Sequence, residues 1–100
     1  MFPVKYLVEF LGTFLFLYMI LESSKYNQYQ PFVIVIGLLA VILMFGTVSG
    51  GHFNPAITAA MWFKGDNSIE PIGYIAAQVL GAVAAFKVHA LITGNADFKY

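Results

Sequence analysis

Three long apolar runs, at residues 4–21, 31–48 and 71–93, dominate the sequence. Each run approaches the roughly 20 residues that an α-helix needs to cross the hydrocarbon core of a bilayer. Only 10% of the residues are charged and 60% are hydrophobic, whereas a soluble domain carries about 25% charged residues. Because lipid offers no partners for backbone N–H and C=O groups, such runs cross membranes as helices or closed barrels. We therefore expect an all-α, multi-pass integral membrane protein that forms one domain over residues 1–100.

The first run contains two charged residues, Lys5 and Glu9. A basic residue ahead of an apolar run is also typical of a secretory signal peptide, whose apolar part is short and uncharged. Glu9 therefore favours a membrane span over a signal peptide. The second run has no charge and begins at Pro31, and proline is well tolerated at the first position of a helix.

Side chains suited to catalysis or metal binding are scarce. The five basic and five acidic residues cancel, which disfavours a nucleic-acid partner. The chain has no cysteine, and His52 has no second metal ligand at a plausible spacing. Paired carboxylates and a nucleophile with its base are missing as well. We therefore expect no enzyme, no cofactor and no metal site, and the partners that remain are the lipid bilayer and small molecules.

The segment at residues 49–63 is too short to be a fourth span. Asn54 is a strong helix N-cap, and Pro55 suits the first helical position. A helix over residues 54–63 would be about 15 Å long, half the thickness of the hydrocarbon core. We expect an extended loop from Ser49 to Phe53 ahead of it, because non-helical backbone at this depth must be buried in protein or line a cavity. The sequence thus predicts three transmembrane helices and one re-entrant half-helix.

The N-terminus of such a half-helix would act on whatever lies near the bilayer midplane. Its positive dipole end and unpaired N–H groups disfavour cations there. The Asn54 side chain can cap the helix with its oxygen and present its NH₂ group to a passing oxygen atom. The alternative is an ordinary helix start with no further function.

Ten residues, Ser-Gly-Gly-His-Phe-Asn-Pro-Ala-Ile-Thr at 49–58, resemble the first half-helix loop of the major intrinsic protein family, the aquaporins and aquaglyceroporins. The sequences Glu-Phe-Leu-Gly-Thr at 9–13 and Ala-Gln-Val-Leu-Gly-Ala at 77–82 agree in order and spacing. The resemblance covers the whole chain but only one repeat of a family normally built from two. It implies a channel in which two half-helices meet head to head around a narrow pore for water or small neutral solutes.

The resemblance also implies roles for individual residues. Asn54 would donate to the permeating molecule, and Glu9 and Gln78 would accept from and donate to the backbone of the re-entrant loop. The alternative for Glu9 is a charge that escapes to the membrane interface. The residues expected at the pore or at the substrate are Asn54, Pro55, Ala56, Gly50, Gly51, His52, Ile57 and Ile34.

The sequence departs from the family pattern at the selectivity constriction. In the family's second repeat an arginine follows Asn-Pro-Ala, but here that position is Ile57, and the chain contains no arginine. The constriction position on the second span would fall on Ile34. Strict water specificity is therefore not expected, and glycerol-sized polyols become candidate solutes beside water.

A single repeat has nothing opposite its half-helix, so the resemblance implies a homo-oligomer built from inverted pairs, which could assemble further into a ring. With three spans, Lys5 and Lys64 lie on one side of the membrane, and Lys25, Lys99 and Lys87 lie on the other. This weak bias of positive charge suits a dual-topology dimer.

Two alternatives to the inverted pair remain. The chain could be a piece of a longer channel, or it could be a non-conducting subunit that associates with a full-length channel. In the second case it would bind through the small-residue face of the third span, which consists of Gly73, Ala77, Gly81 and Ala85.

Overall fold

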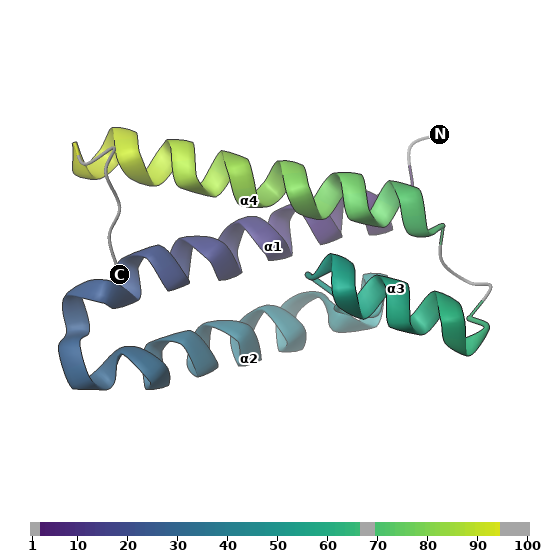
Figure 1. Ribbon diagram of the computed structural model, residues 1–100, viewed down its shortest axis with the longest axis horizontal. Coiled ribbons are helices and arrows are strands. Elements are labelled where there is room, and N and C mark those ends of the chain that lie inside the picture. The colour runs from purple at the N-terminus through teal and green to yellow at the C-terminus, as the bar shows by residue number, and fades with distance from the viewer. Residues whose placement is uncertain (1–2, 67–69, 95–100) are drawn as a thin grey trace.

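The structure, a computed structural model, describes residues 3–66 and 70–94. These residues form helices and connecting loops, with no strand among them. In Figure 1 the long helices run along the molecule and the shortest helix begins near its middle. In chain order the elements are α1 (Val4–Ser23), the 3₁₀ turn η1 (Ser24–Tyr29), α2 (Gln30–Ser49), α3 (Pro55–Lys64) and α4 (Pro71–Thr93).

Two helical stretches in the described part of the chain, Val4–Ser49 and Pro71–Thr93, are long and apolar enough to cross a membrane. The first has 46 residues and doubles back at η1, where Asn27 leaves the helical region with φ 52° and ψ −121°. Its two arms, α1 and α2, have 20 residues each and run antiparallel in Figure 1. The stretch therefore supplies two long helices, and with α4 it gives the three that the sequence predicts.

Several helix ends differ from the expected bounds. α1 continues two residues beyond the apolar run, to Ser23, because the helical hydrogen bonds extend into the polar turn. α2 ends at Ser49, which the sequence assigned to the loop. Gly50 caps it in a left-handed conformation, and the Gly50 N–H donates to the Gly46 carbonyl at 2.8 Å. α3 ends at Lys64 rather than at residue 63, whereas the third expected span, 71–93, coincides with α4.

The small-residue face of α4 packs against α1. A Cβ atom at Gly81 would lie 2.5 Å from the Phe10 carbonyl oxygen and 3.3 Å from the Phe14 amide nitrogen. Ala85, one turn further along, is completely buried. Packing within the chain therefore occupies this face at Gly81 and Ala85. At these two residues the face does not serve as a docking surface for a separate channel.

We expect Gly81→Ala to destabilise the bundle by about 1–3 kcal/mol, the usual range for overpacking. The added methyl meets backbone atoms of α1, which cannot rotate away. Gly46→Ala is the matched control, because its Cβ would meet only Ile42 Cγ2, at 3.5 Å. Thermal unfolding of the purified variants in detergent should show a lower Tm for Gly81→Ala and no loss for Gly46→Ala; equal Tm values would contradict this packing.

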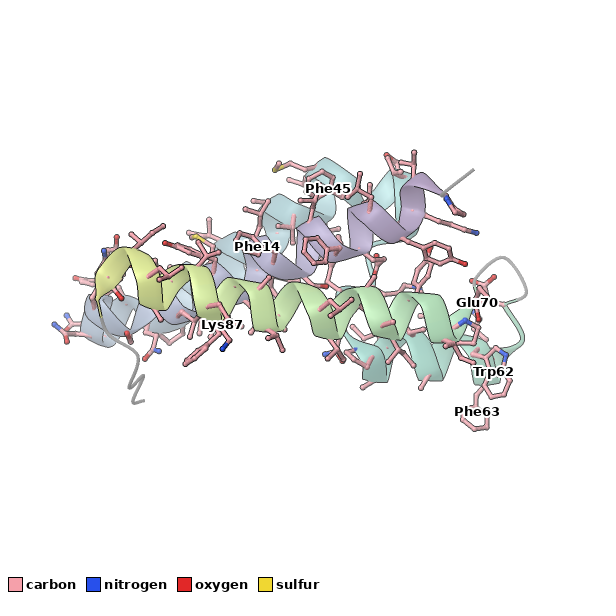
Figure 2. The ribbon with its side chains drawn as sticks, turned by 90° about the horizontal axis from the view of Figure 1, so that it is seen from above. Phe14, Phe45, Trp62, Phe63, Glu70 and Lys87 are labelled. Atoms are coloured by element: carbon pink, nitrogen blue, oxygen red, sulfur yellow. The ribbon has the colours of Figure 1, made fainter. Side chains whose placement is uncertain are left out.

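The outer surface of the bundle is apolar. Large side chains such as Phe32, Leu43 and Leu91 are 64%, 73% and 83% exposed, and so broad an apolar surface requires lipid or protein around it. At the end of α3, Trp62 and Phe63 point away from the bundle (Figure 2), and tryptophan is typical of membrane–water interfaces.

The η1 turn is polar. The Lys25 ammonium lies 2.8 Å from the Glu22 carboxylate. This hydrogen bond and the charge of Glu22 raise the pKa of Lys25. The turn therefore forms a charged end to the bundle, opposite the end at which α3 terminates.

Candidate functional site

The short helix α3 packs against α4 and begins near the middle of the bundle's long axis (Figure 1). Asn54 is its N-cap, with extended backbone, and Asn54 Oδ1 accepts a hydrogen bond from the Ala56 N–H at 2.8 Å. Pro55 is the first helical residue and lacks an N–H that would need a partner. α3 is thus a separate helix of 10 residues, not part of a continuous span, and the predicted half-helix is confirmed.

The loop before α3 is tightly turned, so the expectation of an extended segment was wrong. Gly50, Gly51 and Phe53 all adopt left-handed conformations, with φ values of 93°, 66° and 53°. These turns connect the end of α2 to the start of α3 within a few residues. Glycine adopts such angles without a steric penalty, whereas Phe53 must be held there by its surroundings.

Glu9 of α1 holds this loop. Its side chain is fully buried, so it does not escape to the interface. Glu9 Oε2 accepts from the backbone N–H of His52 at 3.2 Å, and Oε1 accepts from that of Phe53 at 2.8 Å. The hydroxyl of Ser49 also donates to Oε2, at 2.7 Å, and Gln78 Nε2 donates to Oε1, at 2.8 Å. Four donors therefore satisfy a carboxylate that would otherwise be very costly to bury.

Gln78 of α4 extends this network to α3. Its Nε2 donates to Thr58 Oγ1 as well as to Glu9, both at 2.8 Å. Thr58 Oγ1 in turn lies 2.9 Å from His52 Nδ1. Gln78 thus binds two side chains and not the loop backbone, which corrects the expectation of a direct contact. The side-chain amide reaches the loop only through Glu9 and Thr58.

Sequence reasoning did not single out Thr58, Ser49 or Tyr74 as site residues. Thr58 is completely buried. The sequence could have indicated it as a site residue, because it is the one polar residue between Ala56 and Phe63. The Tyr74 hydroxyl donates to the Ser49 carbonyl at 2.6 Å, and its ring meets that of His52 edge to face, with centroids 5.2 Å apart. No sequence pattern pairs Tyr74 with the loop.

Phe53 is the apolar anchor of the loop. It is 2% exposed, and its ring occupies the space beside Gly12, where a Cβ atom would come within 3.0 Å of three ring carbons. A small residue on a membrane-spanning helix commonly lies at a close contact with another helix. The close contact exists, but the partner is the loop rather than another helix.

The remaining predicted site residues lie outside this buried network, except that the Gly51 N–H donates to Ser49 Oγ at 3.2 Å. Gly50, Asn54, Pro55, Ala56 and Ile57 are exposed, and Gly51 is half-buried. Ile34 is half-buried on α2. In the described part of the chain, no group of three His, Cys, Asp or Glu residues could hold a metal ion. The arrangement therefore exposes the N-terminus of α3 and the side-chain amide of Asn54, and the buried polar side chains hold the loop that precedes them.

Comparisons with known proteins agree with this arrangement. A family model described as "Major intrinsic protein" matches residues 2–99. The chain is 39% identical over 111 residues to glycerol uptake facilitator protein-like 6 of Lactiplantibacillus plantarum, a match that covers 94% of this chain and 50% of that protein. It is 40% identical over 99 residues to aquaporin-5 of Mus musculus, covering 88% of this chain and 37% of that protein.

A third relative, aquaporin Z of Photorhabdus laumondii, is 40% identical over 63 residues, covering 61% of this chain and 27% of that protein. The chain spans half the length or less of these relatives. No solved structure gives a significant match. Since the family model matches nearly every residue and the motif-bearing loop leads into a half-length helix, the chain belongs to the major intrinsic protein family.

Proposed function

We propose that this chain forms half of a multi-pass membrane channel for water and small uncharged solutes, and that two copies in opposite orientations complete the pore. The observation that carries the proposal is the exposed start of α3 near the middle of the bundle's long axis, led by Asn54. Its relatives include proteins named aquaporin and glycerol uptake facilitator. Family membership and this geometry together favour a channel.

Asn54 is the residue that would meet the permeating molecule. Its Oδ1 is occupied by the Ala56 N–H, so the Nδ2 group is the part of the side chain that faces outward to donate. The aligned peptide dipoles of α3 place positive potential at the same point. Neutral solutes with an oxygen acceptor are therefore favoured, and cations are repelled.

The remaining residues would shape the pore. Pro55 and Ala56 would pack against the same residues of the second copy, and the carbonyls of Gly50 and Gly51 would face the solute. Ile57, 40% exposed, would present an apolar wall. Selection among neutral solutes would then depend on width more than on charge, so that water passes and glycerol-sized polyols are admitted.

The distribution of lysines supports two orientations. Lys5 lies in the first turn of α1 and Lys64 ends α3 at one end of the bundle. Lys25 lies on η1 at the other end, and Lys87 lies on the half of α4 nearer that end (Figure 2). Lys99, which the sequence assigned to the second end, lies outside the described residues. With similar positive charge at both ends, neither orientation is strongly preferred.

Stopped-flow swelling of liposomes that contain only this purified chain tests the proposal. We expect an osmotic permeability well above that of empty liposomes. We also expect glycerol to enter these liposomes, but more slowly than water does. Permeability equal to that of empty liposomes, with folded protein in the bilayer, would contradict the proposal.

We further expect Asn54→Asp to alter this permeability and to raise the leak of K⁺ and Na⁺. The change puts a negative charge where helix dipoles otherwise repel cations. Asn27→Asp is the matched control, because it makes the same chemical change on the exposed η1 turn. Ion flux measured with a K⁺-sensitive dye should rise for Asn54→Asp only; the same rise for both variants would assign the effect to net charge.

A further inference from the structure

A groove of about 440 Å³ lies at the charged end of the bundle, where η1 joins α1 to α2 (Figure 1). Its lining residues come from these three elements and are Met19, Glu22, Lys25, Tyr26, Val33 and Ile36. The three apolar ones, Met19, Val33 and Ile36, are the furthest from the turn along the chain. The groove therefore has an apolar part beside the helices and a charged part at the turn.

The charged part presents both signs of charge. Lys25 Nζ lies 2.8 Å from Glu22 Oε2, and the two side chains are 62% and 25% exposed. An ammonium group has three N–H donors, so Lys25 can bind an anion while it stays paired. Glu22 Oε1 lies 4.0 Å from His89 Nε2, which is beyond hydrogen-bond distance. This oxygen can therefore accept from a cation.

The position of the groove suits a phospholipid. The η1 turn connects two helices that are long enough to span a bilayer, and the exposed side chains of Tyr26 and Tyr29 surround it. Tyrosine is enriched where a membrane meets water, so lipid headgroups lie at the level of this turn. The acyl chain of such a lipid would then lie at the level of Met19 and Ile36, in the apolar part of the groove.

The two charges favour a zwitterionic headgroup with N–H donors. Lysine binds phosphate well, and the primary ammonium of phosphatidylethanolamine can donate to Glu22 Oε1. The quaternary ammonium of phosphatidylcholine has no N–H and is recognised instead by the face of an aromatic ring. Lys25 Nζ already lies over the Tyr26 ring, 5.8 Å from its centroid. The Glu22 carboxylate in turn repels an anionic headgroup such as phosphatidylglycerol.

We propose that phosphatidylethanolamine occupies this groove, with its phosphate accepting from Lys25, its ammonium donating to Glu22 and one acyl chain lying beside Met19, Val33 and Ile36. The site needs only the hairpin of α1, η1 and α2. It is therefore independent of the inverted pairing proposed above and of solute permeation.

Native mass spectrometry of the unmodified chain tests the headgroup. The chain is released from detergent that contains equal amounts of phosphatidylethanolamine, phosphatidylcholine and phosphatidylglycerol with the same acyl chains. We expect phosphatidylethanolamine to bind about threefold more often, or better, than either of the others, because it makes one additional charge-assisted hydrogen bond. Equal binding of phosphatidylethanolamine and phosphatidylcholine would overturn the proposal, and so would a preference for phosphatidylglycerol.

Substitutions assign this preference to the charged pair. Glu22→Gln should remove the preference for phosphatidylethanolamine, and Lys25→Gln should weaken the binding of all three lipids. Glu70→Gln and Lys64→Gln make the same chemical changes at exposed positions at the other end of the bundle, so they should leave the preference unchanged. A preference that survives Glu22→Gln would contradict the assignment.

Fluorescence quenching in bilayers locates the bound lipid. Because the chain has no cysteine, Phe32→Cys places a single bimane label next to the groove, and Leu91→Cys places one on the exposed face of α4. Phosphatidylethanolamine with a nitroxide on its acyl chain should quench the label at residue 32 more than labelled phosphatidylcholine does, and the two lipids should quench equally at residue 91. Equal quenching at residue 32, or a disulfide between two unlabelled Phe32→Cys copies in place of lipid contact, would overturn the proposal.

Discussion

Glu9→Leu should abolish the folded helical bundle, the largest effect that we expect from a single substitution. The change leaves the N–H groups of His52 and Phe53 and the side chains of Ser49 and Gln78 without their shared acceptor. Each buried group left unpaired costs about 1–3 kcal/mol, so the sum is about 4 kcal/mol or more. The fraction of protein that stays monodisperse in detergent, measured by size-exclusion chromatography, should fall sharply.

Lys5→Leu is the matched control for this change. Lys5 lies one turn earlier on the same helix and is half-buried. Replacing it by leucine removes a charge from this helix but leaves the Glu9 carboxylate in place to accept the hydrogen bonds of the loop. We expect a much smaller effect on the monodisperse fraction. Equal losses for the two variants would mean that Glu9 does not hold the loop.

Gly12→Ala should have the second largest effect. The added methyl would come within 3.0 Å of the Phe53 ring, which is buried and joined to a backbone that is already left-handed. The ring must leave its site, and overpacking of this kind costs about 1–3 kcal/mol. We expect a lower Tm and a loss of osmotic permeability in liposomes, because the displaced loop no longer positions Asn54.

A second substitution that makes space should partly reverse this loss. In Gly12→Ala combined with Phe53→Leu, the smaller side chain leaves room for the methyl group. We expect the double variant to have a higher Tm than Gly12→Ala alone, although Phe53→Leu alone lowers Tm. If the two losses simply add, then Gly12 and Phe53 do not share one contact.

The helices were predictable because their signals are local. Pro31 and Pro71 stand in the first turns of α2 and α4, and Asn54 with Pro55 begins α3. The role of Glu9 was implied by the family resemblance, and it agrees with the general rule that a charge inside a membrane span finds partners in the protein.

The details of the site depend on contacts between distant residues, which the sequence does not specify. Thr58 becomes the link between Gln78 and His52 only because α3 packs against α4. The left-handed backbone at Phe53 is likewise set by packing against Gly12, as no local signal favours that conformation for phenylalanine.

Cysteine cross-linking in membranes tests the central claim, that two inverted copies bring the starts of their half-helices together. The chain has no native cysteine, so Ala56→Cys and Phe63→Cys each introduce a single thiol, at opposite ends of α3. Inverted pairing predicts an oxidised dimer for Ala56→Cys and none for Phe63→Cys, whose copies would lie on opposite sides of the bilayer. A dimer through Phe63→Cys with none through Ala56→Cys would contradict the account.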